Sequence, residues 1–137
     1  MGGAAYEFTV ELDESMLDAE TSLRALLQSE GFGVLTEIDV QATLQSKLQE
    51  AFRPYRILGA CNPVLAHRAL QAEPGVGVLL PCNVVVEDAG GGRTRLRFME
   101  PIAALSLIEN DTLKAVAEEA SARLHRVADS LRSGSHP

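Results

Sequence analysis

The sequence has 137 residues, a length that fits a single domain. Its formal net charge of −7 argues against a nucleic-acid partner, because binding to a phosphate backbone relies on clustered Lys and Arg. Apolar residues make up 46% and charged residues 23% of the chain, a composition typical of globular proteins and not of disordered ones. No apolar run approaches the roughly 20 residues that span a bilayer, residues 1–6 lack the features of a secretory signal, and two Cys make no disulfide scaffold, so we expect a cytoplasmic protein without a membrane partner.

The spacing of apolar residues predicts the elements of the first half of the chain. Residues 6–12 alternate between apolar and polar side chains, which is typical of a strand with one face in water. Capping residues then mark helix ends. The elements expected next are a helix started by Asp13 or Ser15 and ended by Gly31, a strand at 32–40, a short helix capped by Asp39 with Leu44, Leu48 and Phe52 facing inward, and a strand at Tyr55–Cys61.

A strong local signal, Asn62-Pro63, opens the second half. Asn is a favoured N-cap and Pro is common at the first helical position, so a helix is predicted from here to Pro74-Gly75. Pro81 cannot donate to a sheet ladder, which places the strand predicted at 76–87 at a sheet edge or beside a bulge. The remaining expectations are a turn at 89–92, the return strand of a hairpin at 93–99, a short helix or coil at 101–108, and a long helix opened by Asn110 or Asp111.

The predicted order of elements is therefore β-α-β-α-β-α-β-β-α. A hairpin requires at least one antiparallel pair of strands, so we expect an α+β fold in which helices pack on a mixed or antiparallel sheet in two layers. One domain is predicted over residues 1–132, followed by a flexible tail at 133–137.

Cys61 stands between the end of a predicted strand and the start of a predicted helix. The helix dipole and the free N–H groups at such a place stabilise negative charge, and they can lower the pKa of a thiol and make it more nucleophilic. Arg56 or Arg68 could add a positive neighbour. The alternative interpretation is that Cys61 is a small buried apolar side chain, as free Cys often is.

Cys82 follows Pro81 in a predicted buried strand, where a bulge could aim its side chain at a site or where it could belong to the core. Each Cys is followed by Asn, at Cys61-Asn62 and Cys82-Asn83. If the two thiols face one crevice, a reversible disulfide is possible, provided that their Cα atoms lie within about 7 Å of each other.

Motifs for metal, cofactor or hydrolytic chemistry are absent from the sequence. The possible metal ligands are Cys61, Cys82, His67, His125 and Asp39, and none has C-x-x-C or H-x-x-x-H spacing, so no metal is expected. The sequence also lacks the glycine motifs of phosphate and dinucleotide sites and the G-x-S-x-G motif, so we expect no cofactor and no serine triad. Asp39 could serve as a general base only if it opened onto the cysteine crevice.

Three arginines, Arg93, Arg95 and Arg97, share one face of the predicted return strand. They could form an anion site for a carboxylate or phosphate. Alternatively, they could pair with Glu87, Asp88 and acidic helix residues as an ordinary solvated face, because cross-strand charge pairs are common.

A family resemblance rests on two strings of the sequence, LGACNP at 58–63 and LPCNVVV at 80–86, with support from segments at 31–35, 39–40 and 52–57. Over about residues 6–131 the chain resembles the bacterial and archaeal family called domain of unknown function 302. The resemblance implies a compact α+β fold in small, often dimeric cytosolic proteins, and it implies no reaction. Members look like stand-alone domains or attachments to redox and sulfur-handling proteins, which supports thiol chemistry at Cys61 and Cys82.

Two functional hypotheses follow. The first is a domain that binds a small anionic or sulfur-containing ligand in a crevice. The residues expected there are Cys61 as nucleophile or attachment point, Cys82 as the second thiol, and Asn62, Asn83, Tyr55 and Arg56. The second hypothesis is a non-catalytic module that forms a homodimer through the hairpin edge or the final helix, with structural cysteines. No established catalytic motif supports an enzyme.

Overall fold

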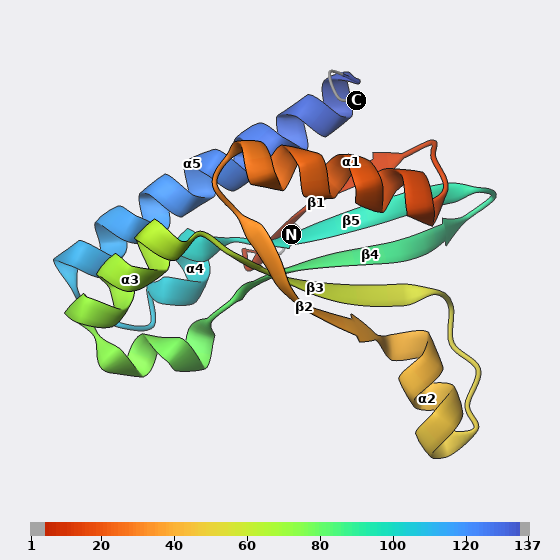
Figure 1. Cartoon of the computed structure of the whole chain (residues 1–137), viewed down its shortest axis with the longest axis horizontal. Helices are drawn as coiled ribbons and strands as arrows, with labels where there is room; N and C mark the ends of the chain where they lie inside the picture. The colour runs from red at the N-terminus through yellow and green to blue at the C-terminus, as the bar shows by residue number, and fades with distance from the viewer. Residues whose placement is uncertain (1–4, 135–137) are drawn as a thin grey trace.

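A computed structural model describes residues 5–134, in which five antiparallel strands form one sheet (Figure 1). The strands are β1 (Glu7–Leu12), β2 (Gly33–Asp39), β3 (Tyr55–Cys61), β4 (Cys82–Gly90) and β5 (Arg93–Met99), in the spatial order β1-β5-β4-β3-β2. The helices are α1 (Met16–Ser29), α2 (Val40–Leu48), α3 (Pro63–Ala72), the 3₁₀ helix η1 (Pro74–Leu79), α4 (Pro101–Leu105) and α5 (Asp111–Ser133). The predicted α+β fold with an antiparallel sheet is confirmed.

Side-chain caps start the helices where the sequence places them. Asp18 N–H donates to Ser15 Oγ (3.1 Å) at α1, and Ala42 N–H donates to Asp39 Oδ1 (2.8 Å) at α2. The same arrangement occurs at α3, with Asn62 as N-cap, and at α5, with Asn110 as N-cap. Each cap satisfies one of the N–H groups that the first turn of a helix leaves without a partner.

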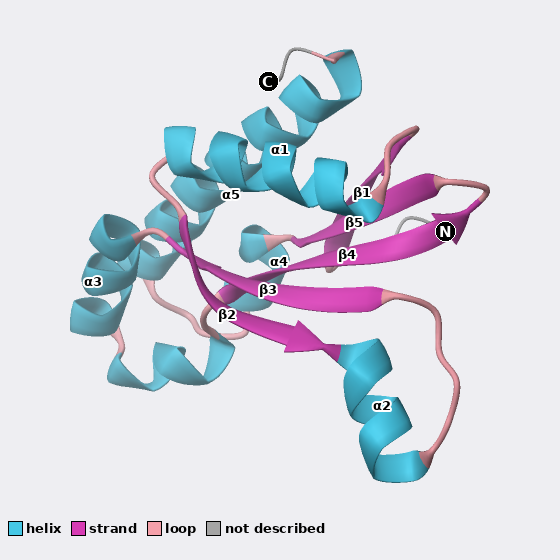
Figure 2. Cartoon of the chain, turned by 45° about the vertical axis from the view of Figure 1, so that its right-hand side comes forward, coloured by secondary structure: helices cyan, strands magenta, loops and turns pink. Residues whose placement is uncertain are grey.

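The core lies between the sheet and the two long helices, α1 and α5, which cover the same face (Figure 2). From the sheet, the buried side chains include Val84, Val86, Leu96 and Phe98. The predicted apolar stripe of α5 is buried throughout, from Leu113 to Leu131. Neither long helix lies over the opposite face of the sheet, which carries the alternate side chains of each strand.

Helix α2 differs from the prediction because it buries nothing. Leu48 is 61% exposed, Leu44 is half-buried, and Phe52 lies beyond the end of the helix. The helix continues from the end of β2 and projects beyond the sheet (Figure 1), so its apolar side chains have no second layer to pack against. The expected inward stripe is therefore wrong, although the Asp39 cap is confirmed.

The segment before β4 also differs from the prediction. Residues 74–79 form η1, and the strand begins only at Cys82, so Pro81 precedes the ladder and does not interrupt it. The expected edge position is wrong, because β4 lies inside the sheet between β3 and β5. Short apolar runs are ambiguous between strand and helix: Val76 is buried, whereas Val78 is 88% exposed.

The first strand and the last helix have slightly different bounds from those predicted. The first strand starts at Glu7, and α5 continues to Ser133, where Gly134 ends it in a left-handed conformation. Ser133, the first residue of the predicted tail, therefore belongs to the helix, and residues 135–137 lie outside the described residues. Within residues 5–134, no helix has the length and apolar character needed to cross a membrane.

Candidate functional site

A cavity of about 280 Å³ lies between the ends of β3 and β4, helices α3 and η1, and helices α4 and α5. Its walls are almost entirely apolar. The lining side chains include Phe32, Leu65, Ala69, Leu80, Val116 and Ala120. Among the described residues, no charged side chain lines this cavity, and its polar groups are one amide and two thiols.

The two thiols, Cys61 and Cys82, both line the cavity and are both free. Strand register brings their backbones close, because Ala60 is the direct partner of Cys82 at the last rung of the β3–β4 ladder and Cys61 is the next residue along β3. Cys82 is buried and Cys61 is half-buried. The structure therefore places both predicted cysteines in one site.

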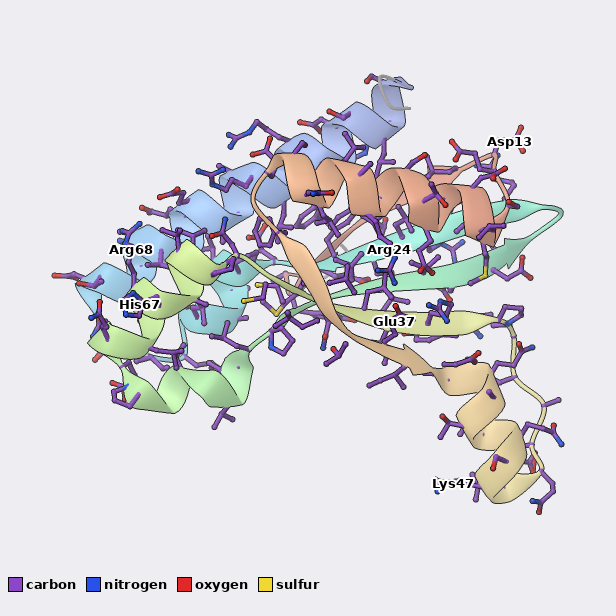
Figure 3. All side chains as sticks on the ribbon, in the orientation of Figure 1. Asp13, Arg24, Glu37, Lys47, His67 and Arg68 are labelled. Carbon is purple, nitrogen blue, oxygen red and sulfur yellow. The ribbon has the colours of Figure 1, made fainter. Side chains whose placement is uncertain are left out.

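The electrostatic setting of the thiols opposes the activation that the helix N-terminus suggested. Burial raises the pKa of Cys61, and burial together with the neighbouring Cys61 raises the pKa of Cys82 to about 11. Arg68 gives no help, since it lies exposed on α3 beside His67 (Figure 3) and pairs with Glu119 (3.3 Å). Both thiols are thus protonated near neutral pH, and a Cys61 nucleophile stays a prediction.

Asn62 also lines the cavity, but its side chain is used within the fold. Its Oδ1 accepts a hydrogen bond from Leu65 N–H (3.2 Å), and its Nδ2 donates to the Glu30 carbonyl (3.3 Å). The turn at Gly31 fits closely around this amide, because a Cβ atom there would lie 2.9 Å from Nδ2. Asn62 therefore caps α3 and ties it to the end of α1.

The other three candidates lie elsewhere. Arg56 forms ion pairs with Glu20 (2.8 Å) and Glu37 (2.9 Å) under α1, where Arg24 also reaches Glu37 (Figure 3). Tyr55 and Asn83 line a more open pocket of about 380 Å³ that also includes Val85 and Arg97. The six residues expected in one crevice are therefore split between two pockets and an ion-pair cluster.

Comparison with known proteins decides the family. A family model described as "Domain of unknown function DUF302" matches residues 8–131. The chain belongs to this family. A crystal structure of an uncharacterized conserved DUF302 protein from Bacillus stearothermophilus is similar to it, with 32% sequence identity, 94% of this chain and 100% of that chain covered, and a TM-score of 0.86. No curated protein matches the chain.

The arginine face of this DUF302 domain is a network of cross-strand ion pairs. Glu11 on β1 pairs with Arg95 (2.9 Å), and Glu7 pairs with Arg97 (3.0 Å). The alternative in which the arginines pair with acidic residues is confirmed for Glu87, and Glu7 and Glu11 of β1 replace the acidic helix residues that were expected. Asp88, also expected there, accepts a hydrogen bond from Gly90 N–H instead.

Glu87 belongs to this network, and its complete burial was not predicted from the sequence. Its side chain has no exposed surface, and its carboxylate accepts hydrogen bonds from Arg53 Nε (2.8 Å) and from Arg97 Nε. Burial acts to raise the pKa of Glu87, but the hydrogen bonds from Arg97 and Arg53 outweigh it and hold that pKa below its ordinary value. The signal in the sequence was its position opposite Arg95 in the hairpin.

His125 has a partner that the sequence did not reveal. Its Nε2 lies 2.8 Å from Glu100 Oε1, and its ring stacks on Phe8 with centroids 3.7 Å apart. Ser121 hydrogen-bonds to the same carboxylate rather than to the imidazole, so the three groups do not form a nucleophilic triad. Residues 5–134 contain no group of three or more His, Cys, Asp or Glu that could hold a metal ion.

The partly open cavity of this DUF302 domain can therefore bind a small molecule by apolar contact, with two neutral thiols at its wall. Thiols in this state are weak hydrogen-bond donors and soft, polarisable contacts. The exposed N-cap Asp39 does not line the cavity, so it supplies no general base there.

Proposed function

We propose that this protein is a binding domain that holds a small apolar or sulfur-containing molecule in the cavity lined by Cys61 and Cys82. The observation that carries the proposal is the cavity itself, which combines an apolar wall with both thiols of the described chain. Its volume of about 280 Å³ lies at the lower end of ligand pockets. A cavity of about 150 Å³ in another protein is known to take up benzene, so one ring fits here with space to spare.

An anionic ligand has less support. The cavity has no Lys or Arg in its lining, and the Asn62 amide is engaged on both sides. The N–H groups of Leu65 and Ala66, in the first turn of α3, bond to Asn62 itself. A carboxylate that entered would lose its hydration and gain no charged partner. The proposal keeps the sulfur-containing ligand class and a reducing, cytoplasmic setting in which both thiols stay free.

The test compares three probes of similar size by ¹H–¹⁵N NMR: benzene, thiophene and benzoate. Benzene and thiophene should shift amide signals of α3 and of the start of β4, whereas benzoate should not. Ala120→Leu fills the cavity and should abolish these shifts, while Ala122→Leu, on the exposed side of the same helix, should leave them unchanged. Absence of binding by both apolar probes, or equal binding to the Ala120→Leu variant, would show that the cavity is not a ligand site.

A second candidate is a homodimer that uses the uncovered face of the sheet. That face carries half-buried apolar side chains of adjacent strands, Tyr55, Ile57 and Val85, beside Ile38, which is 48% exposed. Its charged groups already pair within the chain, so a second copy could cover the apolar strip without leaving an ion unpaired. Five strands spaced about 4.8 Å apart and about 20 Å long give roughly 1,000 Å² of buried surface for two copies, the lower limit for a specific interface.

Sedimentation equilibrium over a wide concentration range tests this candidate. The wild-type chain should dimerise, Val85→Lys should be monomeric, and Thr21→Lys on the exposed side of α1 should dimerise like the wild type. A wild-type chain that is monomeric at every concentration excludes the dimer.

A further inference from the structure

The pairing of two thiols at one cavity wall carries an inference beyond the uptake of a small apolar molecule. We propose that Cys61 and Cys82 together capture a trivalent organoarsenical, with the arsenic atom bridging the two sulfur atoms and its apolar substituent inside the cavity. The inference rests on the cavity of the proposed function and adds a covalent ligand class to it.

Strand register brings the backbones of the two cysteines close together, and the shared cavity brings their side chains together. Ala60 faces Cys82 directly in the antiparallel ladder, so Cys61 is a diagonal neighbour of Cys82. Directly facing Cα atoms of an antiparallel pair, here those of Ala60 and Cys82, lie about 4.5–5.5 Å apart. Cys61 lies one residue beyond this last rung of the β3–β4 ladder, so the alternation of side chains along a strand does not hold its thiol on the opposite face from Cys82. Both side chains line the same cavity, so an atom bonded to one sulfur is held beside the other.

The electrical neutrality of the cavity selects the electrophile. An arsonous acid, R–As(OH)₂, reacts with two thiols by exchange: two As–O bonds break, two As–S bonds form, and each thiol proton leaves with a hydroxide as water. No electron is transferred, and the product R–As(SCys)₂ carries no charge. This outcome suits a lining without a charged side chain among the described residues.

A metal ion fits the same thiols less well. Structural Zn²⁺ takes four ligands, and the part of the chain that the structure describes offers no group of three or more His, Cys, Asp or Glu. A trivalent arsenic that already carries one organic substituent needs only two sulfur atoms. Its substituent then replaces the missing ligands with apolar contact, for which Leu65, Ala69 and Val116 provide the wall.

The test uses phenylarsine oxide, which forms phenylarsonous acid in water, with native mass spectrometry as the readout. The wild-type protein should gain one phenylarsenic unit and lose two hydrogens, and the adduct should persist in excess glutathione but be removed by the dithiol 2,3-dimercaptopropanol. Cys61→Ala and Cys82→Ala should each bind the phenylarsenic unit at least about 100-fold more weakly than the wild type, because no second As–S bond can form within the protein.

Controls keep the result decisive. Cys61→Ser and Cys82→Ser provide a second pair of variants, and circular dichroism checks that each variant is folded. A folded wild-type protein that forms no adduct, or whose adduct glutathione removes as readily as from the single variants, overturns the inference. Thiophene binding without arsenic bridging would overturn this inference alone, whereas bridging without benzene or thiophene binding would overturn the proposed function alone.

Discussion

Replacement of Glu87 by Gln is expected to destabilise the fold although the site lies far from the cavity. The variant keeps the shape of the side chain but removes the charge that accepts hydrogen bonds from Arg53 and Arg97. Hydrogen bonds to a charged group contribute about 1.5–3 kcal/mol each, and breaking a fully buried pair costs about 3–5 kcal/mol. Because these arginines are 48% and 30% exposed and can recover water, we expect a net loss of about 2 kcal/mol.

The assay is urea unfolding at several pH values, followed by circular dichroism. The pKa of Glu87 is lower in the folded state than its ordinary value, so its contribution is complete above the unfolded-state pKa of about 4.3 and disappears as the pH falls through the folded-state pKa. The difference between wild type and Glu87→Gln should therefore be largest near neutral pH and should vanish in acid.

A matched control is Glu11→Gln, which removes another carboxylate of the same network. Glu11 is 45% exposed, so its ion pairs are screened by solvent and its loss should be smaller. If Glu87→Gln is as stable as the wild type, or if its deficit does not shrink in acid, the charge of the buried carboxylate does not stabilise the fold.

Three further predictions concern the site and its surroundings. Gly59→Ala should lower the free energy of unfolding by about 1–3 kcal/mol, because a Cβ atom there would lie 2.7 Å from Pro81 Cγ. Gly33→Ala is the control and should be close to neutral, because no atom lies within 4 Å of its added Cβ. Thermal melts compare the two variants. Asn62→Ala should lower stability by about 1–2 kcal/mol through loss of the α3 cap, and chemical unfolding that finds no larger effect than for the exposed Gln71→Ala would contradict that role. Cys61 should alkylate more slowly than a free thiol near neutral pH and faster as pH rises, since burial raises its pKa; peptide mass spectrometry measures the rate, and fast alkylation near neutral pH would restore the activated-thiol hypothesis.

Local signals in the sequence predicted the elements that depend on local chemistry. Asn62-Pro63 identified both the end of β3 and the start of α3, because a cap and a helix-starting proline act within one turn. The apolar stripe of α5 was predicted equally well, since its side chains repeat with the helical period and are all buried.

The predictions that failed depended on which distant part of the fold packs against an element. The apolar spacing of α2 looks like that of a packed helix, but spacing does not show whether a second layer exists, and here none covers Leu48. Arg56 was expected near the cysteines, yet its partner is Glu20 on α1, a residue 36 positions away. Likewise, the shared cavity of the two cysteines depends on the β3–β4 register, which a single sequence does not specify.

The connection between β3 and β4 determines how the wall of the cavity can move. These strands are antiparallel neighbours, and the chain between them forms α3 and η1 and with them the outer wall of the cavity. The segment that contains α3 and η1 can move outward as one cooperative unit while every hydrogen-bonded pair of the β3–β4 ladder stays intact. An opening of this wall would separate Leu65, Ala69 and Val76 from the core but would break no rung of the ladder, so backbone amides of α3 should exchange with solvent deuterium before those of the flanking strands.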